Sequence, residues 1–327
     1  MCQKKHLILM PPPARLRHAV ALFAVLALSG CLPENTSFMD PQGTVAAAQR
    51  LHLIRVTAIT MIAVLPVLVL VPWLLWRYRY GNTKARYRPN WEFSLPLEVA
   101  MWGVPLAIIA ALSVQLWKST AQLDPYKPLE PGIAALNVQV VALNWKWLFI
   151  YPDLGVASVG QMAFPIDQPV SLTLTSDTVM QSFMISALAG QIYVMPGGTT
   201  KLNLNANYVG TFQGQNTQFN GFGFQNQKFE AVGMSMDAFA TWLDKLRADG
   251  IPLDAGVYAK LAENSTPAQA HDQLNNGAMP KRVVYFKSVT PGLFDSVLAR
   301  YRGGQPLAHD QQPGSATYSA TQAGAGN

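Results

Sequence analysis

The chain has 327 residues, of which 50% are apolar and only 13% are charged, so it can hold two domains or one domain and a membrane anchor. Its formal net charge is +6, but four of the positive charges fall within the first 30 residues, on Lys4, Lys5, Arg15 and Arg17. The small remaining excess and the lack of a recognition motif exclude a nucleic-acid partner.

Residues 1–30 are typical of an export signal, because basic residues precede a short apolar run, 19–30, that ends in small side chains. The order Leu28-Ser29-Gly30-Cys31 then resembles a bacterial lipobox, which implies a diacylglycerol on the Cys31 thiol. A plain signal peptide beside an unrelated cysteine is the alternative. We favour the lipobox, since cleavage after residue 30 leaves Cys31 with no other cysteine to pair with. Residues 31–55 would be a connector on the outer side.

Residues 56–117 predict a transmembrane helical hairpin. The runs 56–76 and 99–117 contain no charged residue, and as helices they would be roughly 28–32 Å long, close to the thickness of a bilayer core. Packed membrane helices tolerate the prolines that interrupt these runs, which are Pro66, Pro72 and Pro105. The loop 77–98 carries five basic and two acidic residues, so we expect it in the cytoplasm and the long remainder in the periplasm.

After a proline-rich linker, residues 118–132, the periodicity changes. Residues 133–234 contain three stretches in which apolar and polar residues alternate, at 136–152, 164–177 and 199–208. Turn residues separate them, a pattern that predicts an antiparallel β-sandwich.

Residues 235–302 return to helical spacing and predict a helical C-terminal extension. Ser235 is the predicted N-cap, and apolar residues follow at i, i+3, i+4 and i+7, which are Phe239, Trp242, Leu243 and Leu246. Residues 303–327 are rich in Gly, Ala, Ser, Gln and Pro, a composition that predicts a disordered tail.

Three motifs resemble subunit II of the heme–copper terminal oxidases. Residues 144–147 resemble the aromatic segment of that family, 176–183 the strand with its first copper-ligand histidine, and 210–227 its main copper loop. With the signal, hairpin and sandwich, the resemblance extends over nearly the whole chain. It implies a two-helix transmembrane hairpin plus an all-β cupredoxin-like sandwich with a short α-helical C-terminal extension.

The copper ligands of this family are missing. Its cytochrome c oxidases hold two coppers here with cysteines, histidines, a methionine and a glutamate carbonyl. The resemblance places amides and one phenyl ring at these positions, namely Gln181, Asn216, Gln218, Asn220, Phe224 and Gln227. Copper centres of this type need thiolates and imidazoles, and no cysteine or histidine lies between Lys118 and Met234. We therefore predict no metal site, and we expect the amides to satisfy backbone groups of the loop.

One branch of the family, subunit II of quinol oxidases, keeps the fold but lacks the copper centre. This chain resembles that branch. The resemblance implies a non-catalytic structural subunit of a proton-translocating oxidase that passes electrons from ubiquinol to oxygen. Its partners would be the heme-bearing subunit I, further integral membrane subunits and membrane lipid, with ubiquinol as the substrate of the complex. Hemes and one copper would belong to subunit I. No catalytic or cofactor-binding residue is assigned to this chain, which is expected in the bacterial inner membrane with its β domain in the periplasm.

Two alternative functions fit parts of the sequence. The first is a cytochrome c oxidase subunit II with an unrecognised metal site, which the missing thiols and imidazoles disfavour. The second is a lipid-anchored periplasmic binding module, which the extent of the motif correspondence disfavours. We interpret Trp145 and Trp147 as a packed aromatic anchor at the interface with subunit I.

Overall fold

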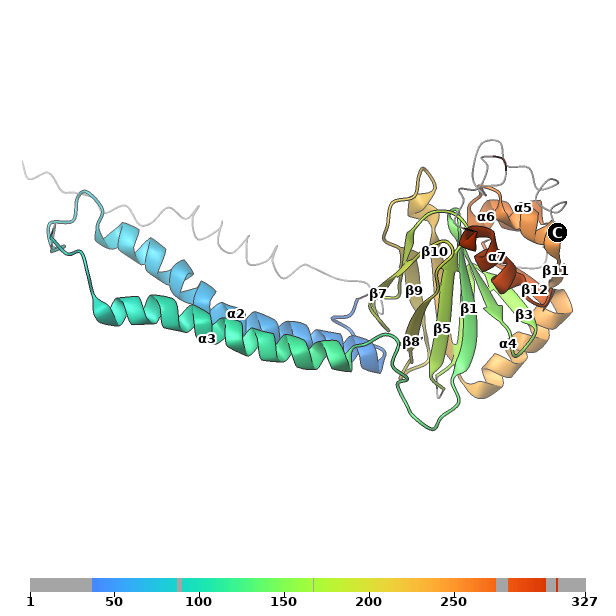
Figure 1. Cartoon of the computed structure of the whole chain (residues 1–327), viewed down its shortest axis with the longest axis horizontal. Coiled ribbons are helices and arrows are strands. Elements are labelled where there is room, and N and C mark those ends of the chain that lie inside the picture. Colours follow the sequence, from blue (N-terminus) through green and yellow to red (C-terminus); the bar gives the residue numbers. More distant parts are fainter. Residues whose placement is uncertain (1–36, 87–89, 167, 275–281, 304–309, 311–327) are drawn as a thin grey trace, which may run out of the picture. The chain divides into compact units, whose positions relative to one another are not determined.

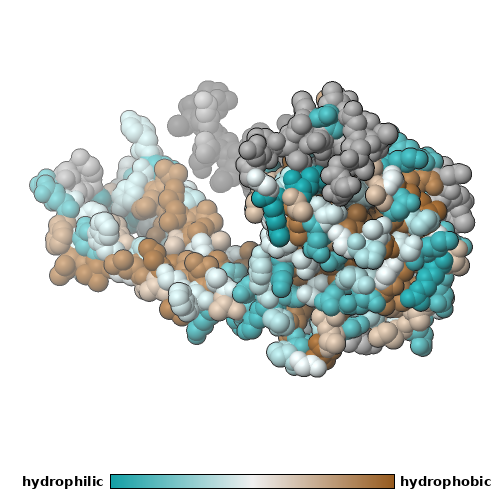
Figure 2. Space-filling view, turned by 45° about the vertical axis from the view of Figure 1, so that its right-hand side comes forward, coloured by the Kyte–Doolittle hydropathy of each residue, from teal (hydrophilic) through white to brown (hydrophobic). Residues whose placement is uncertain are grey.

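The structure, a computed structural model, describes residues 37–86, 90–166, 168–274, 282–303 and 310. Two long helices come first, α2 (Thr44–Arg77) and α3 (Leu95–Gln122). At 1.5 Å per residue they are about 51 and 42 Å long, more than a bilayer core requires. Both contain an apolar window of 18 residues with no share buried within the chain. Figure 2 shows this apolar surface on the helices and a mostly polar surface on the β domain.

The hairpin is confirmed, but its predicted boundaries are wrong. Helix α2 begins at Thr44, within the predicted connector 31–55, and α3 continues to Gln122, within the predicted linker 118–132. A run without charged residues marks only the part of a helix that is suited to lipid. The helix itself continues as long as the residues favour helix formation, as the alanines after Thr44 do. The three prolines lie inside the helices as expected.

The start of α2 is capped by a residue that is distant in the sequence. Gly43 at the N-cap has no side chain, and Asn205 Oδ1 instead accepts hydrogen bonds from Thr44 N (3.0 Å) and Thr44 Oγ1 (2.7 Å). A Cβ on Gly43 would lie 2.3 Å from the carbonyl oxygen of Asn205. Glycine is therefore required here for the close approach of the two backbones.

The β domain is a sandwich of two sheets (Figure 1). Within the described residues, one sheet has the strand order β11-β12-β3-β2-β1-β5-β8 and the other β4-β10-β9-β6-β7. The strands in chain order are β1 (Leu136–Leu143), β2 (Lys146–Tyr151), β3 (Val156–Val159), β4 (Gln161–Pro165), β5 (Val170–Ser176), β6 (Gln181–Met184), β7 (Gln191–Val194), β8 (Thr200–Leu204), β9 (Gly210–Asn216), β10 (Lys228–Met234), β11 (Ile251–Leu253) and β12 (Val284–Val289). The predicted sandwich is confirmed, but a purely antiparallel arrangement is wrong, since β1 and β5, β4 and β10, and β11 and β12 pair in parallel.

Aromatic side chains fill the space between the two sheets. Trp147 is fully buried, with its ring centroid 5.1 Å from Phe183, and Phe183 stacks on Phe229 at 5.1 Å. A Cβ on Gly214 would lie 2.0 Å from the Phe229 ring, so β9 needs glycine at that position. The expectation that Trp147 lies at an interface is therefore wrong, because its strand directs the ring into the core.

The C-terminal extension is not purely helical, which corrects the prediction for residues 235–302. It contains helices α4 (Met236–Asp249), α5 (Ala255–Ala262), α6 (Pro267–Gln273) and α7 (Leu293–Arg302), but also strands β11 and β12 of the larger sheet. Ser235 caps α4 as predicted, accepting a hydrogen bond from Ala238 N (3.3 Å). Helices α5–α7 pack a second hydrophobic core against the outer face of β1–β3. All residues of β2 are consequently buried, as in sheets covered on both faces.

The predicted signal 1–30 and Cys31 lie outside the described residues. The predicted tail 303–327 also lies outside them, apart from Gly303 and Asp310.

Candidate functional site

The candidate site lies where several strands of the sandwich end. Gln181 begins β6, Asn216 ends β9, and a loop with a short 3-10 helix (Phe224–Asn226) leads to Gln227 just before β10. The structure joins four of the six predicted positions by side-chain hydrogen bonds, and we call these four the amide cluster: Gln181, Asn216, Asn220 and Gln227.

Gln227 is the centre of the amide cluster and is fully buried. Its Nε2 group donates to the Leu143 carbonyl oxygen (3.2 Å) and to Gln181 Oε1. Its Oε1 atom accepts from Asn216 Nδ2 (3.0 Å) and Asn220 Nδ2 (2.7 Å). A primary amide offers two donors and two acceptor positions, so the hydrogen-bonding capacity of Gln227 is complete.

The outer members of the cluster satisfy backbone groups. Gln181 Nε2 donates to the Leu143 carbonyl (3.2 Å) and to Thr178 Oγ1 (2.8 Å). Asn216 Oδ1 accepts from Ser182 N (3.0 Å) and Gln218 N (2.9 Å), while its Nδ2 donates to the Gln218 carbonyl (2.8 Å). The predicted role of these amides is thus seen in the contacts, because they bind backbone groups that would otherwise be buried without partners.

Two predicted positions stand apart from these side-chain contacts. Gln218 takes part through its backbone, whereas the Phe224 ring packs against Phe219 with centroids 5.7 Å apart.

The donor chemistry of this site does not fit copper. Its side chains offer amide oxygens and amide N–H groups, and the N–H groups already donate to oxygen atoms within the cluster. Copper centres of the cupredoxin type need deprotonated sulfur and unprotonated imidazole nitrogen. In the part of the chain that the structure describes, no three side chains of His, Cys, Asp or Glu form a group that could hold a metal ion.

Trp145 supports the loop of the amide cluster from one side. Its backbone has φ +65°, a left-handed conformation that is unusual for a large side chain. Its Nε1 donates to the Asn220 carbonyl (3.2 Å), and a Cβ on Gly223 would lie 2.0 Å from its ring. The loop therefore lies directly on the indole, which needs glycine at position 223.

Sequence reasoning missed Lys146, although it lies in the aromatic motif. The side chain is fully buried, and Nζ donates to the Glu263 carbonyl (2.7 Å), the Ser265 carbonyl (3.0 Å) and Ser265 Oγ (2.8 Å). Burial lowers the pKa of Lys146 to about 7, and the Glu263 carboxylate opposes this shift. The available signal was a lysine between two tryptophans, directly before the uninterrupted apolar run 147–151.

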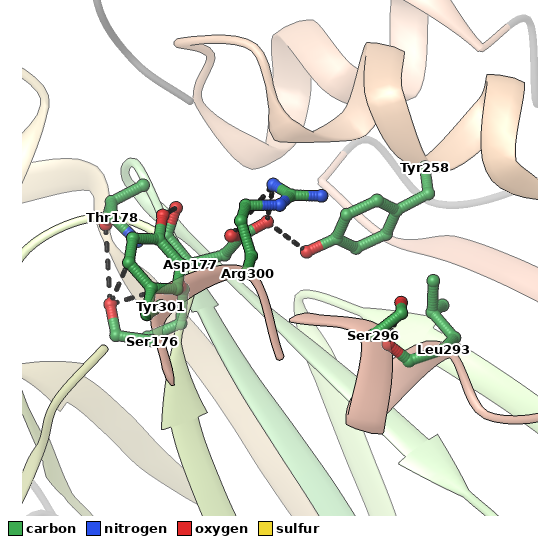
Figure 3. A network of polar contacts seen from close by, with 9 residues as sticks. Ser176, Asp177, Thr178, Tyr258, Leu293, Ser296, Arg300 and Tyr301 are labelled. Carbon is green, nitrogen blue, oxygen red and sulfur yellow. Dashed lines mark hydrogen bonds and ion pairs between the residues drawn. The ribbon is translucent and has the colours of Figure 1, made fainter. Parts of the chain in front are cut away.

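Asp177 is the second missed residue and the centre of the network in Figure 3. Its buried carboxylate accepts from Arg300 on both oxygens (2.9 Å each) and from the Tyr258 hydroxyl (2.5 Å). The Tyr301 hydroxyl donates to its backbone carbonyl (2.8 Å). Burial raises the pKa of the Asp177 carboxyl, and the Arg300 guanidinium opposes this effect. These partners come from α5 and α7, so the network joins the sandwich to the extension.

Comparison with known proteins identifies the family. The chain is 38% identical over 301 residues to the cytochrome bo(3) ubiquinol oxidase subunit 2 of Pseudomonas aeruginosa, covering 90% of this chain and 85% of that protein. It is 38% identical over 296 residues to the ubiquinol oxidase subunit 2 of Acetobacter aceti, covering 90% and 91%. The chain belongs to the ubiquinol oxidase subunit 2 family.

The predicted family is thereby confirmed. No family model matches the chain. Among solved structures, the periplasmic domain of cytochrome oxidase subunit II from Bradyrhizobium japonicum matches with 21% identity and a TM-score of 0.33, over 35% of this chain and 94% of that domain. As a member of the ubiquinol oxidase subunit 2 family with two apolar helices, the chain fits an inner-membrane subunit of a heme–copper oxidase.

Replacement of Gln227 should destabilise this chain more than replacement of an exposed residue of the same loop. Gln227→Leu keeps the side chain buried but removes both donors and both acceptors, so several buried groups lose a partner at about 1–3 kcal/mol each. We expect a fall in melting temperature of several degrees for the detergent-purified chain. The exposed Gln225→Leu is the matched control; equal melting temperatures for the two variants would refute the central role of Gln227.

Because of Lys146, the free energy of unfolding should rise with pH above neutrality. Between pH 7 and 10.5 the unfolded chain binds a proton on Lys146 that the folded chain has lost, so the free energy of unfolding increases with pH in this window. Lys146→Met should remove up to about 1.4 kcal/mol of this increase per pH unit. Urea unfolding at pH 7, 8 and 9, followed by tryptophan fluorescence, measures the slope. The exposed Lys245→Met should keep the wild-type slope; a wild-type slope in Lys146→Met would contradict the lowered pKa.

Proposed function

We propose that this chain is the non-catalytic structural subunit II of a proton-translocating ubiquinol oxidase in the aerobic respiratory chain. The hairpin holds the heme-bearing subunit I, and the β domain caps it on the periplasmic side. The complex transfers electrons from ubiquinol to oxygen. Support comes from the relatives, which are named ubiquinol oxidase subunit 2, and from the amide cluster.

The amide cluster is the observation that carries the proposal. A subunit that relays electrons from a water-soluble donor needs a redox centre outside the membrane, and the cluster offers no thiolate or imidazole to hold one. A quinol is soluble in the membrane and can reach subunit I through the lipid. An outer copper relay is then unnecessary, and this chain has a structural role.

The cofactors of the complex are assigned to its partner. We propose that the hemes and one copper lie in subunit I and that this chain binds none of them. Further integral membrane subunits and lipid would cover the rest of the hairpin, whose apolar windows bury no share of their residues within the chain. Because exposed apolar helices are stable only against lipid or other helices, the hairpin supplies the contact surface.

Purification of the complex through a tag on this chain tests the proposed function. We expect a many-helix heme protein to co-purify with it. The purified complex should oxidise ubiquinol and contain one copper. Copper analysis after separation of the subunits should find none on this chain. Stoichiometric copper on this chain, or oxidation of reduced cytochrome c in place of ubiquinol, would refute the proposal.

We also propose a lipid anchor on Cys31, supported by the lipobox-like sequence before it. Cys31→Ser should abolish incorporation of a labelled fatty acid but leave the chain in the membrane after an alkaline wash. The reason is that an acyl chain adds about 0.8 kcal/mol per buried CH₂ to the membrane affinity, far less than two spanning helices supply. Unchanged labelling of the variant would show that Cys31 is not the acylated residue, and release from the membrane would show that the helices do not suffice.

A further inference from the structure

We propose that the C-terminal extension keeps the loop of the amide cluster ordered. Helix α5 of the extension contacts the two segments that hold the amide cluster in place, one through Tyr258 in the middle of the helix and the other through its C-cap, Glu263. The order of the loop 216–227 therefore depends on contacts with α5 and α7, which lie far along the chain.

The first fastening joins α5 to the segment before β6. Tyr258 on α5 donates to Asp177 Oδ2 (2.5 Å), and Arg300 on α7 donates to both carboxylate oxygens (2.9 Å each). The next residue, Thr178, accepts a hydrogen bond from Gln181 Nε2 (2.8 Å) through its side chain. The position of Asp177 thus sets the position of an acceptor that the amide cluster uses. Figure 3 shows Asp177 and Thr178 side by side, with Tyr258 and Arg300 directed at the carboxylate.

The second fastening joins the end of α5 to the turn between β1 and β2. Lys146 Nζ donates to the carbonyl of Glu263, the C-cap of α5 (2.7 Å), and to both Ser265 oxygens. In the same turn, Asn144 Nδ2 donates to Asn264 Oδ1 (2.5 Å). Trp145 lies between these two residues and donates to the Asn220 carbonyl (3.2 Å). Of the three successive residues 144–146, the first and last therefore contact the extension and the middle one contacts the cluster loop.

Because Asp177 and Lys146 are buried, the amide cluster depends on their contacts with the extension. Asp177 and Lys146 are both fully buried, and the partners named above come from the extension. A buried carboxylate or amine without partners is strongly unfavourable, so loss of these contacts would move both side chains toward water. Thr178 and Trp145 are covalently adjacent to them and would move as well. The cluster would then lose a support on each side.

A matched pair of Tyr→Phe variants in the intact oxidase complex tests this proposal. Tyr258→Phe removes the hydroxyl that donates to Asp177, whereas Tyr285→Phe removes a hydroxyl that binds Gln161 and Trp242, away from the cluster. Hydrogen–deuterium exchange with mass spectrometry reports on the loop, because the Asn216 and Gln218 amides are hydrogen-bonded within it. We expect at least tenfold faster exchange in 216–227 for Tyr258→Phe and no change there for Tyr285→Phe.

A second variant makes a larger change at the same contact. Asp177→Asn keeps the shape of the side chain and removes its charge from Arg300, and it should also speed exchange in 216–227. Wild-type exchange of this loop in both Tyr258→Phe and Asp177→Asn would overturn the proposal. Equal acceleration by Tyr285→Phe would overturn it too, since the effect would then be a general loss of stability. Quinol oxidation measured in parallel separates this result from the proposed function, because a complex that turns over ubiquinol with an unaffected loop contradicts only the present inference.

Discussion

The requirement that buried polar groups find partners governs this structure more than any other constraint. At the end of the sandwich where the sequence resemblance places the copper-ligand positions, Gln227 uses both donors and both acceptors of its amide inside the protein. The neighbouring amides satisfy the backbone around it. An amide cluster can replace a metal structurally because both bring converging strands together through several directional contacts. It cannot replace a metal in electron transfer, since an amide has no accessible redox state.

The same constraint explains why the sandwich and the extension form one unit. Two ionisable side chains of the sandwich, Lys146 and Asp177, are buried and find partners in α5, α7 and the turn after α5. Apolar packing follows the same division, because the outer face of β1–β3 contributes a second core with the helices. The extension is therefore an integral layer of the domain, although it follows the last strand of the recognisable sandwich in the sequence.

Local sequence signals predicted the parts of the fold that depend on local chemistry. Runs without charge located the membrane helices, the alternation of apolar residues located the region of the sandwich, and Ser235 marked the start of α4. Strand β9 lies within residues 210–227, which the family resemblance predicted to be a loop. Its residue Gly214 is in fact needed in a strand to admit the Phe229 ring. The positions of the amide cluster came from the family resemblance, but the central role of Gln227 did not.

The rest depended on contacts between residues far apart in the chain. The partners of Lys146 and Asp177 follow them by more than 80 residues, at Glu263, Tyr258 and Arg300. No short sequence motif predicts these pairings. Likewise, the interface role assigned to Trp147 failed because a tryptophan in a strand can face either a partner or a core. Only the pairing of the sheets decides which one it faces.

Strand β12 has a consequence for how the cell makes this domain. It lies near the end of the chain but pairs with β3, so the larger sheet lacks an inner strand until Val284–Val289 has emerged. During synthesis the apolar residues on this face of β1–β3 stay uncovered until the last helices of the chain have been made. A chain that ends before α7 would therefore expose this apolar face and be prone to aggregate.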